Sequence, residues 1–75
     1  MDDFIKLVDQ IEKILIFLFQ HDEEFVVRLR DVHIYCKTHY DIPVEKVNKA
    51  MAVLASRGSI KQVAIGADMY IIPNK

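Results

Sequence analysis

The 75-residue sequence contains one cysteine, two glycines, two prolines and no tryptophan. A single cysteine excludes a framework of internal disulfides, so we expect a reducing, cytoplasmic environment. Two glycines leave no room for a glycine-rich phosphate-binding loop. The longest apolar run, residues 14–19, is too short to cross a bilayer, and the acidic N-terminus is unlike a secretory signal. We therefore expect no membrane partner.

Apolar residues are abundant by contrast. They make up 52% of the chain, which predicts a packed core rather than disorder. The length predicts a single domain over residues 1–75. A core of this size supplies only roughly 3–5 kcal/mol of net stability, and domains of this size often gain the rest from a partner or a second copy.

Charge is unevenly divided along the chain. The net charge is −1, yet residues 1–24 carry −5 and residues 25–75 carry +4. A near-zero total argues against a nucleic-acid partner. The cationic second part argues for one, because a phosphate backbone responds to the local field.

The apolar spacing predicts three helices. Spacings of three and four over residues 3–20 predict the first, with Asp2 or Asp3 as its N-cap. A short β-prone piece at 25–27 precedes a second helix from about residue 29, whose inward positions are Leu29, Val32, Tyr35, Cys36 and Tyr40. Residues 39–42 form the expected turn. Pro43 is suited to the first position of a third helix, about 43–57, and Gly58 to its end.

The remaining residues predict a β-hairpin. Residues 60–65 and 69–72 are β-rich, with a three-residue loop at 66–68, and Pro73 ends the second strand. The fold class is α+β, mainly α.

The order of elements and its apolar skeleton resemble the winged helix-turn-helix superfamily. The matching residues are Ile11, Ile14, Leu15 and Leu18; Leu29-x-x-Val32-x-x-x-Cys36; and Ile42-Pro43-Val44-Glu45-Lys46-Val47 leading to Met51, Leu54 and Gly58-Ser59-Ile60. In size the chain is similar to small stand-alone regulators of archaea and their viruses or plasmids. The resemblance implies a winged helix with three helices, a short strand and a two-stranded wing. The second helix is about one turn longer than usual, and the wing is short.

This resemblance implies a protein that binds double-stranded DNA, a transcriptional regulator with its third helix in the major groove. The outward positions of that helix are then Val44, Glu45, Lys46, Asn48, Lys49 and Ala52, where Asn48 suits an adenine edge. Arg28, Arg30, Ser56, Arg57 and Lys61 are candidates for phosphate contacts. The alternative for the helix residues is a solvated charged face, and for Arg28 and Arg30 it is pairing with nearby acids.

Other chemistry is weakly supported. His33, Cys36 and His39 are spaced three apart, which spreads them around a helix instead of converging on a metal. We expect Cys36 in the core, with an intersubunit disulfide as the alternative. No nucleophile elbow is present, so we expect neither an enzyme nor a cofactor nor a small-molecule substrate.

The first helix carries more apolar residues than one face needs. We expect it to form a homodimer interface through Phe4, Ile5, Val8, Ile16, Phe17 and Phe19. The alternative is that these residues cover the wing and the third helix within one subunit. The main alternative function is a protein–protein interaction module of a larger assembly. A DNA-binding role would place the protein at the nucleoid, or in a host cell if it is viral.

Overall fold

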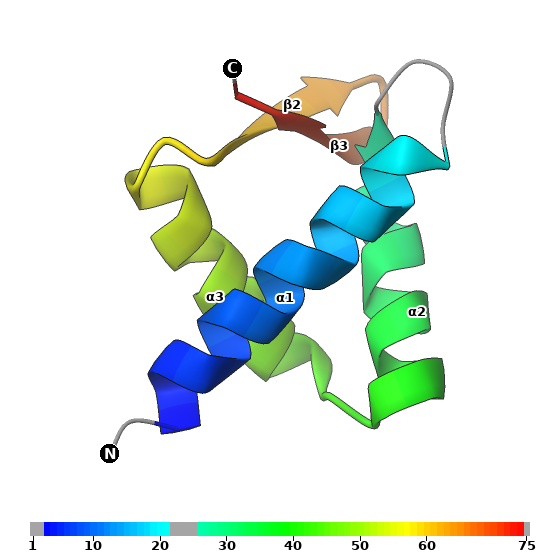
Figure 1. Ribbon diagram of the computed structural model, residues 1–75. Coiled ribbons are helices and arrows are strands. Elements are labelled where there is room, and N and C mark those ends of the chain that lie inside the picture. The colour runs from blue at the N-terminus through cyan, green and yellow to red at the C-terminus, as the bar shows by residue number, and fades with distance from the viewer. Residues whose placement is uncertain (1–2, 22–25, 75) are drawn as a thin grey trace.

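The computed structural model describes residues 3–21 and 26–74, which form a mainly helical α+β domain (Figure 1). Three helices and a three-stranded antiparallel sheet follow the order α1, Asp3–Gln20; β1, Val27–Arg28; α2, Leu29–Tyr40; α3, Val44–Ser56; β2, Ile60–Ile65; and β3, Asp68–Pro73. The predicted helices and hairpin are all present within a few residues of their expected bounds. The predicted cap at Asp2 and the strand residue Phe25 lie outside the described residues.

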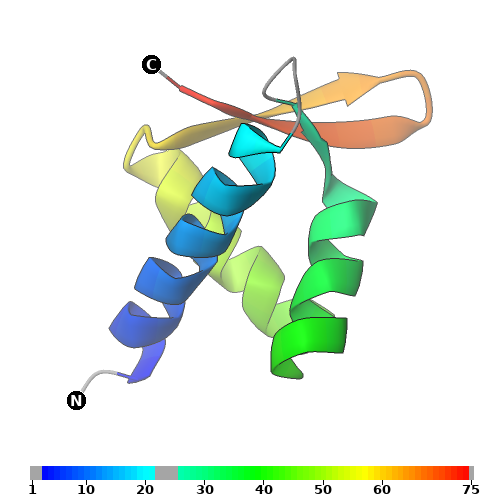
Figure 2. The same ribbon diagram turned by 45° about the vertical axis from the view of Figure 1, so that its right-hand side comes forward.

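The sheet lies across one end of the three helices. Its strand order is β1-β3-β2, with Val27 opposite Ile71 and Ile60 opposite Pro73. In both ribbon views α1 crosses α3 and α2 lies to one side (Figures 1 and 2). The tip of the hairpin extends past the helices (Figure 2). Among the described residues, no helix or strand covers one side of α2 and α3.

One hydrophobic core joins all six elements. Its apolar residues recur at spacings of three and four on each helix, as an amphipathic helix requires. Burying one such side chain fully stabilises the fold by about 1.5–3 kcal/mol. The buried residues are Val8, Ile11, Ile14, Leu15, Phe19, Val27, Val32, Cys36, Ile42, Val47, Ala50, Met51, Leu54, Ile60 and Ile71.

The burial pattern corrects three sequence predictions. Val8 and Phe19, expected at a dimer interface, are only 1% and 5% exposed and belong to the protomer's own core. Tyr40, expected to face inward, is 47% exposed. Tyr40 is the last residue of α2, beyond the part of the helix that packs on the core.

Helix α3 is bounded by backbone signals that lie close to the predicted ones. Pro43 is its N-cap, with extended backbone, rather than its first helical residue. At the other end Gly58 has φ +82°, its N–H donates to the carbonyl of Ala55, and the Ser59 N–H donates to the carbonyl of Leu54. These two bonds form a Schellman motif, which satisfies carbonyls at the end of the helix.

The turn between α2 and α3 contains no glycine. Asp41 adopts the left-handed conformation instead, with φ 55° and ψ 40°, and its N–H donates to the carbonyl of Lys37. Aspartate tolerates this conformation better than most residues because its short side chain bonds locally. The Lys37 ammonium lies 3.0 Å from the Asp41 carboxylate. The turn therefore directs the chain into α3 over only three residues.

The hairpin loop is one residue shorter than predicted. Asp68 pairs with Ile65, so the loop consists of Gly66 and Ala67 alone. Gly66 has φ +64° and Ala67 does not have positive φ, which is the pattern of a type II′ turn. Among the described helices, none is long and apolar enough to cross a membrane.

Candidate nucleic-acid interface

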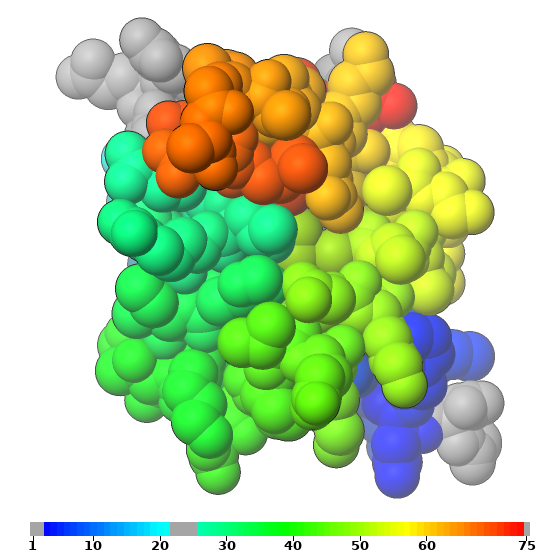
Figure 3. Space-filling view, turned by 180° about the vertical axis from the view of Figure 1, so that it is seen from behind, coloured from blue at the N-terminus to red at the C-terminus, as the bar shows by residue number. Residues whose placement is uncertain are grey.

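The outward face of α3 follows from the burial of its opposite face. Val47, Ala50, Met51 and Leu54 are buried against the rest of the domain. The residues that remain exposed are Val44, Glu45, Lys46, Asn48, Lys49, Ala52 and Ser56. All the predicted reading positions of this helix are thus accessible. Figure 3 shows this side of the molecule, with α2 in green beside α3 in yellow-green, below the orange hairpin.

The middle of this face holds one carboxylate and two small residues, and the lysines lie beside it. Glu45, Ala52 and Ser56 occupy the middle of the stripe, at intervals that return to nearly the same side of a helix. Ala52 has only a methyl side chain, so it allows a close approach of another surface. Lys49 lies next to this line, and no acidic side chain pairs with it among the described residues.

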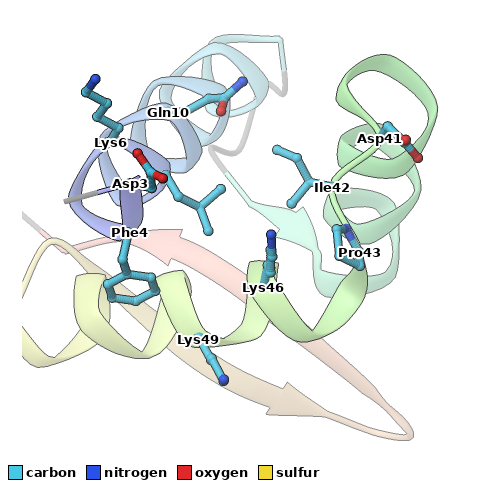
Figure 4. A pocket seen from close by; sticks show the side chains of 10 residues that line it. Asp3, Phe4, Lys6, Gln10, Asp41, Ile42, Pro43, Lys46 and Lys49 are labelled. Atoms are coloured by element: carbon cyan, nitrogen blue, oxygen red, sulfur yellow. The ribbon is translucent and has the colours of Figure 1, made fainter. Parts of the chain in front are cut away.

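Lys46 faces a different flank of the helix. It lines a groove of about 510 Å³ that also contains Phe4 and Leu7 of α1, and Ile42 and Pro43 of the turn. In Figure 4 the Lys46 side chain lies between α1 and Ile42; Lys49 also lines the groove, but its side chain points away from α1. Lys46 and Asn48 are therefore on opposite flanks, and a single flat partner cannot contact both equally.

Helix α2 supplies a second row of polar side chains beside α3. Arg30, His33 and Lys37 recur at spacings of three and four, so they share one face of α2. His33 contacts α3 directly: its Nε2 lies 2.7 Å from Oδ1 of Asn48. The polar faces of the two helices consequently form one continuous surface.

Sequence reasoning missed His33 and Lys37 as members of this surface. His33 was considered only as a metal ligand, and Lys37 was assigned no role. The signal was present, because these residues and Arg30 repeat with the helical period on a side that Val32 and Cys36 do not occupy. What the sequence lacked was the position of α2 relative to α3.

Arg28 lies apart from Arg30. It is half-buried in β1, opposite Tyr70 of β3, and its guanidinium carbon is 5.9 Å from the centre of the Tyr70 ring. A cation over an aromatic face at this distance is weakly attracted to it. Arg28 thus belongs to the outer face of the sheet, whereas Arg30 is exposed on α2.

The remaining predicted phosphate contacts lie at the end of α3 and beyond it. Ser56, Arg57 and Lys61 are all exposed. The tip of the hairpin is different, because Ile65 and Met69 are exposed apolar residues and Asp68 is acidic. Within residues 62–74 the hairpin carries no lysine or arginine. The cationic side chains that could contact phosphate therefore lie at the base of the hairpin and not at its tip.

His33, Cys36 and His39 point in three directions. His33 bonds to Asn48, Cys36 is 0% exposed, and the His39 ring lies 4.3 Å from the ring of Tyr35. Burial raises the pKa of the Cys36 thiol from 9.0 to about 11. A thiol enclosed in this way cannot reach a second chain in this conformation. Across residues 3–21 and 26–74, no three His, Cys, Asp or Glu side chains gather in a way that could hold a metal ion.

The four exposed residues of the predicted dimer interface do not share one face of α1. Ile5 and Ile16 are 53% and 49% exposed and lie eleven residues apart, about three turns, on the same side. Phe17 instead faces α2, where its ring centre is 6.1 Å from that of Tyr35. Phe4 lines the groove beside α3. An interface through α1 would thus centre on Ile5 and Ile16.

A cluster of rings covers the junction of α1 and α2, and we call it the aromatic patch. Phe17 meets His21 edge-on at 4.3 Å between ring centres, and Tyr35 lies between Phe17, His39 and Tyr40. Phe17, Tyr40 and the neighbouring Ile34 are 44–55% exposed. Apolar surface of this kind is available to a protein partner.

No family model, no curated protein and no solved structure matches this chain.

Proposed function

We propose that this protein is a winged-helix domain that binds double-stranded DNA and regulates transcription. In this proposal α2 and α3 form the helix-turn-helix, and β2 and β3 form the wing. The element order and the three-residue turn between α2 and α3 support it.

One observation carries the proposal: the outward side of α3 is exposed along its whole length while its other side is buried. A helix with side chains is about 10–12 Å across, and the major groove is about 12 Å wide. The small Ala52 at the centre of the stripe permits a close fit. Asn48 and Lys49 are then near base edges, where amide and ammonium groups discriminate between bases.

The surrounding cations suit the phosphate backbone. Arg30 lies in the first turn of α2, where backbone N–H groups and the helix dipole favour anions. Arg57 and Lys61 flank the C-terminal end of α3. Contacts of this kind position a protein on the duplex without reading its sequence. Glu45 opposes them, because a carboxylate on this face repels phosphate unless it accepts a hydrogen bond from a cytosine amino group.

The direct test is binding of the protein to random duplex DNA at low and at moderate salt. A DNA-binding domain gains affinity as counterions are released, so binding is expected at 50 mM salt and should weaken steeply by 200 mM. Absence of binding at 50 mM salt would contradict the proposal. The variant Ala52→Glu gives a sharper test of DNA binding, because it adds a second carboxylate to the middle of the outward face of α3 and leaves the core unchanged.

A homodimer through α1 is part of the same proposal. Two copies would read two half-sites about one helical turn apart on the DNA, and linked binding raises affinity. The Ile5 and Ile16 pair is the part of the predicted interface that remains exposed on one side. Sedimentation at high micromolar concentration tests this, and a monomer there would contradict it.

The second candidate function is a protein–protein interaction module. The aromatic patch supports it, because exposed rings are typical of protein interfaces. Tyr35→Ala and Phe17→Ala would then abolish partner binding, whereas alanine at Lys49 would not. If the protein is a DNA-binding domain instead, substitutions in the patch should leave DNA affinity unchanged.

A further inference from the structure

His33 and Asn48 join the two helices of the candidate interface. They lie 15 residues apart in the sequence, and the imidazole Nε2 is 2.7 Å from the amide Oδ1. A side-chain amide oxygen can only accept, so the imidazole N–H donates this bond. Among the described residues it is the one side-chain hydrogen bond between two helices.

The bond fixes how the Asn48 amide is rotated. With Oδ1 held toward α2, the Nδ2 amino group is the part of the amide left to face an outside partner. An asparagine that reads adenine needs the reverse balance, because its oxygen must accept from the N6 amino group while its nitrogen donates to N7. Guanine presents two acceptors instead, N7 and O6. An amide that offers its N–H groups is thus matched to guanine.

We infer that His33 is a positioning residue that orients the Asn48 amide to read guanine. The sequence analysis instead predicted that Asn48 reads adenine. This inference rests on the proposed function, since it assigns a base preference to the same face of α3. Neither side chain belongs to the buried core, so the two residues can be changed without emptying it.

The experiment measures base preference and the hydrogen bond separately. A preferred site is first selected from random duplexes, and the base pair read by Asn48 is found from the loss of preference in Asn48→Ala. Wild type, His33→Leu and His33→Gln are then compared on duplexes that carry guanine, 7-deazaguanine or adenine at that position. Gln keeps an N–H donor at this position and Leu does not. Thr38→Ala, a change on another side of α2, is the matched control.

We expect wild type to favour guanine over adenine by about five- to tenfold, within the discrimination of a good base contact. The preference should fall below about twofold in His33→Leu, return in His33→Gln and persist in Thr38→Ala. Replacing N7 by carbon should weaken wild type but not His33→Leu. A wild-type preference for adenine, or a guanine preference unchanged in His33→Leu, overturns the inference.

The side-chain amide resonances of Asn48 in the free protein separate the two possible failures. They should move in His33→Leu and return toward wild type in His33→Gln. If they do not move although the protein binds duplex DNA, the positioning role is wrong and the proposed function stands. If they move although the protein binds no duplex at low salt, the proposed function fails, and the base preference fails with it.

Discussion

Replacing Lys46 and Lys49 together by alanine tests the contribution of α3 to DNA affinity. Five cations surround the outward face without an acidic partner in the described residues: Arg30, Lys46, Lys49, Arg57 and Lys61. If each neutralises one phosphate, log K falls with log salt with a slope of about −4.5, and affinity drops about 500-fold between 50 and 200 mM salt. Without the two lysines, the slope becomes about −2.7 and the drop about 40-fold.

The same relation gives the loss of affinity at one salt concentration. Each phosphate contact contributes about eightfold at 0.1 M salt, so the double variant should bind about 60-fold more weakly. Both lysines are exposed, and alanine has the highest helix propensity, so the fold should persist. Fluorescence anisotropy with a labelled duplex across a salt series measures both quantities.

The matched control lowers the net charge by the same amount, but on α1 instead of α3. Lys13→Glu changes the net charge by the same two units at an exposed position of α1 that does not line the groove beside Lys46 and Lys49. This variant should keep the wild-type slope and lose less than about threefold in affinity, which reflects long-range attraction alone. An equal loss in both variants would refute the reasoning, because it would mean that net charge rather than the face of α3 determines binding.

Three further predictions concern stability and association. Cys36 keeps its proton to about pH 11 in the folded state, whereas the unfolded thiol ionises near pH 9.0. The free energy of unfolding should therefore fall by about 1.4 kcal/mol per pH unit between these two pH values. Denaturant titrations across this pH range should show this slope in wild type and not in Cys36→Ala. Gly58→Ala should cost about 1–2 kcal/mol, because φ +82° is unfavourable with a Cβ whose nearest neighbour, at 3.8 Å, is in ordinary contact. An α1 dimer should dissociate in Ile16→Ser and associate more tightly at high salt, because Asp9 and Glu12 lie between the two isoleucines; sedimentation equilibrium measures both effects.

Local signals predicted the elements well. The helical period predicted α1 as residues 3–20, and Pro43 and Gly58 predicted the ends of α3 to within two residues. These features depend on backbone preferences and short-range spacing. The predicted hairpin loop was one residue too long, because Asp68 is equally suited to a turn and to the first position of β3.

Long-range packing was the part that the sequence left open. Helix α1 is apolar on most sides, so its period cannot tell which residues meet α2, α3 and the sheet. Val8 and Phe19 were assigned to an interface and are core, because neighbouring elements extend over them. The contact between His33 and Asn48 depends on how α2 lies against α3, which no spacing within either helix specifies.

The most direct test of the central claim is an NMR titration of the isotope-labelled protein with a short duplex at low salt. Resonances of the exposed side of α3, from Glu45 to Ser56, and of Arg30, His33 and Lys37 should shift most, while those of Ile5, Asp9 and Ile16 should remain unchanged. Shifts confined to the aromatic patch or to α1, or no shifts at all, would contradict the claim that α3 is the DNA-binding element.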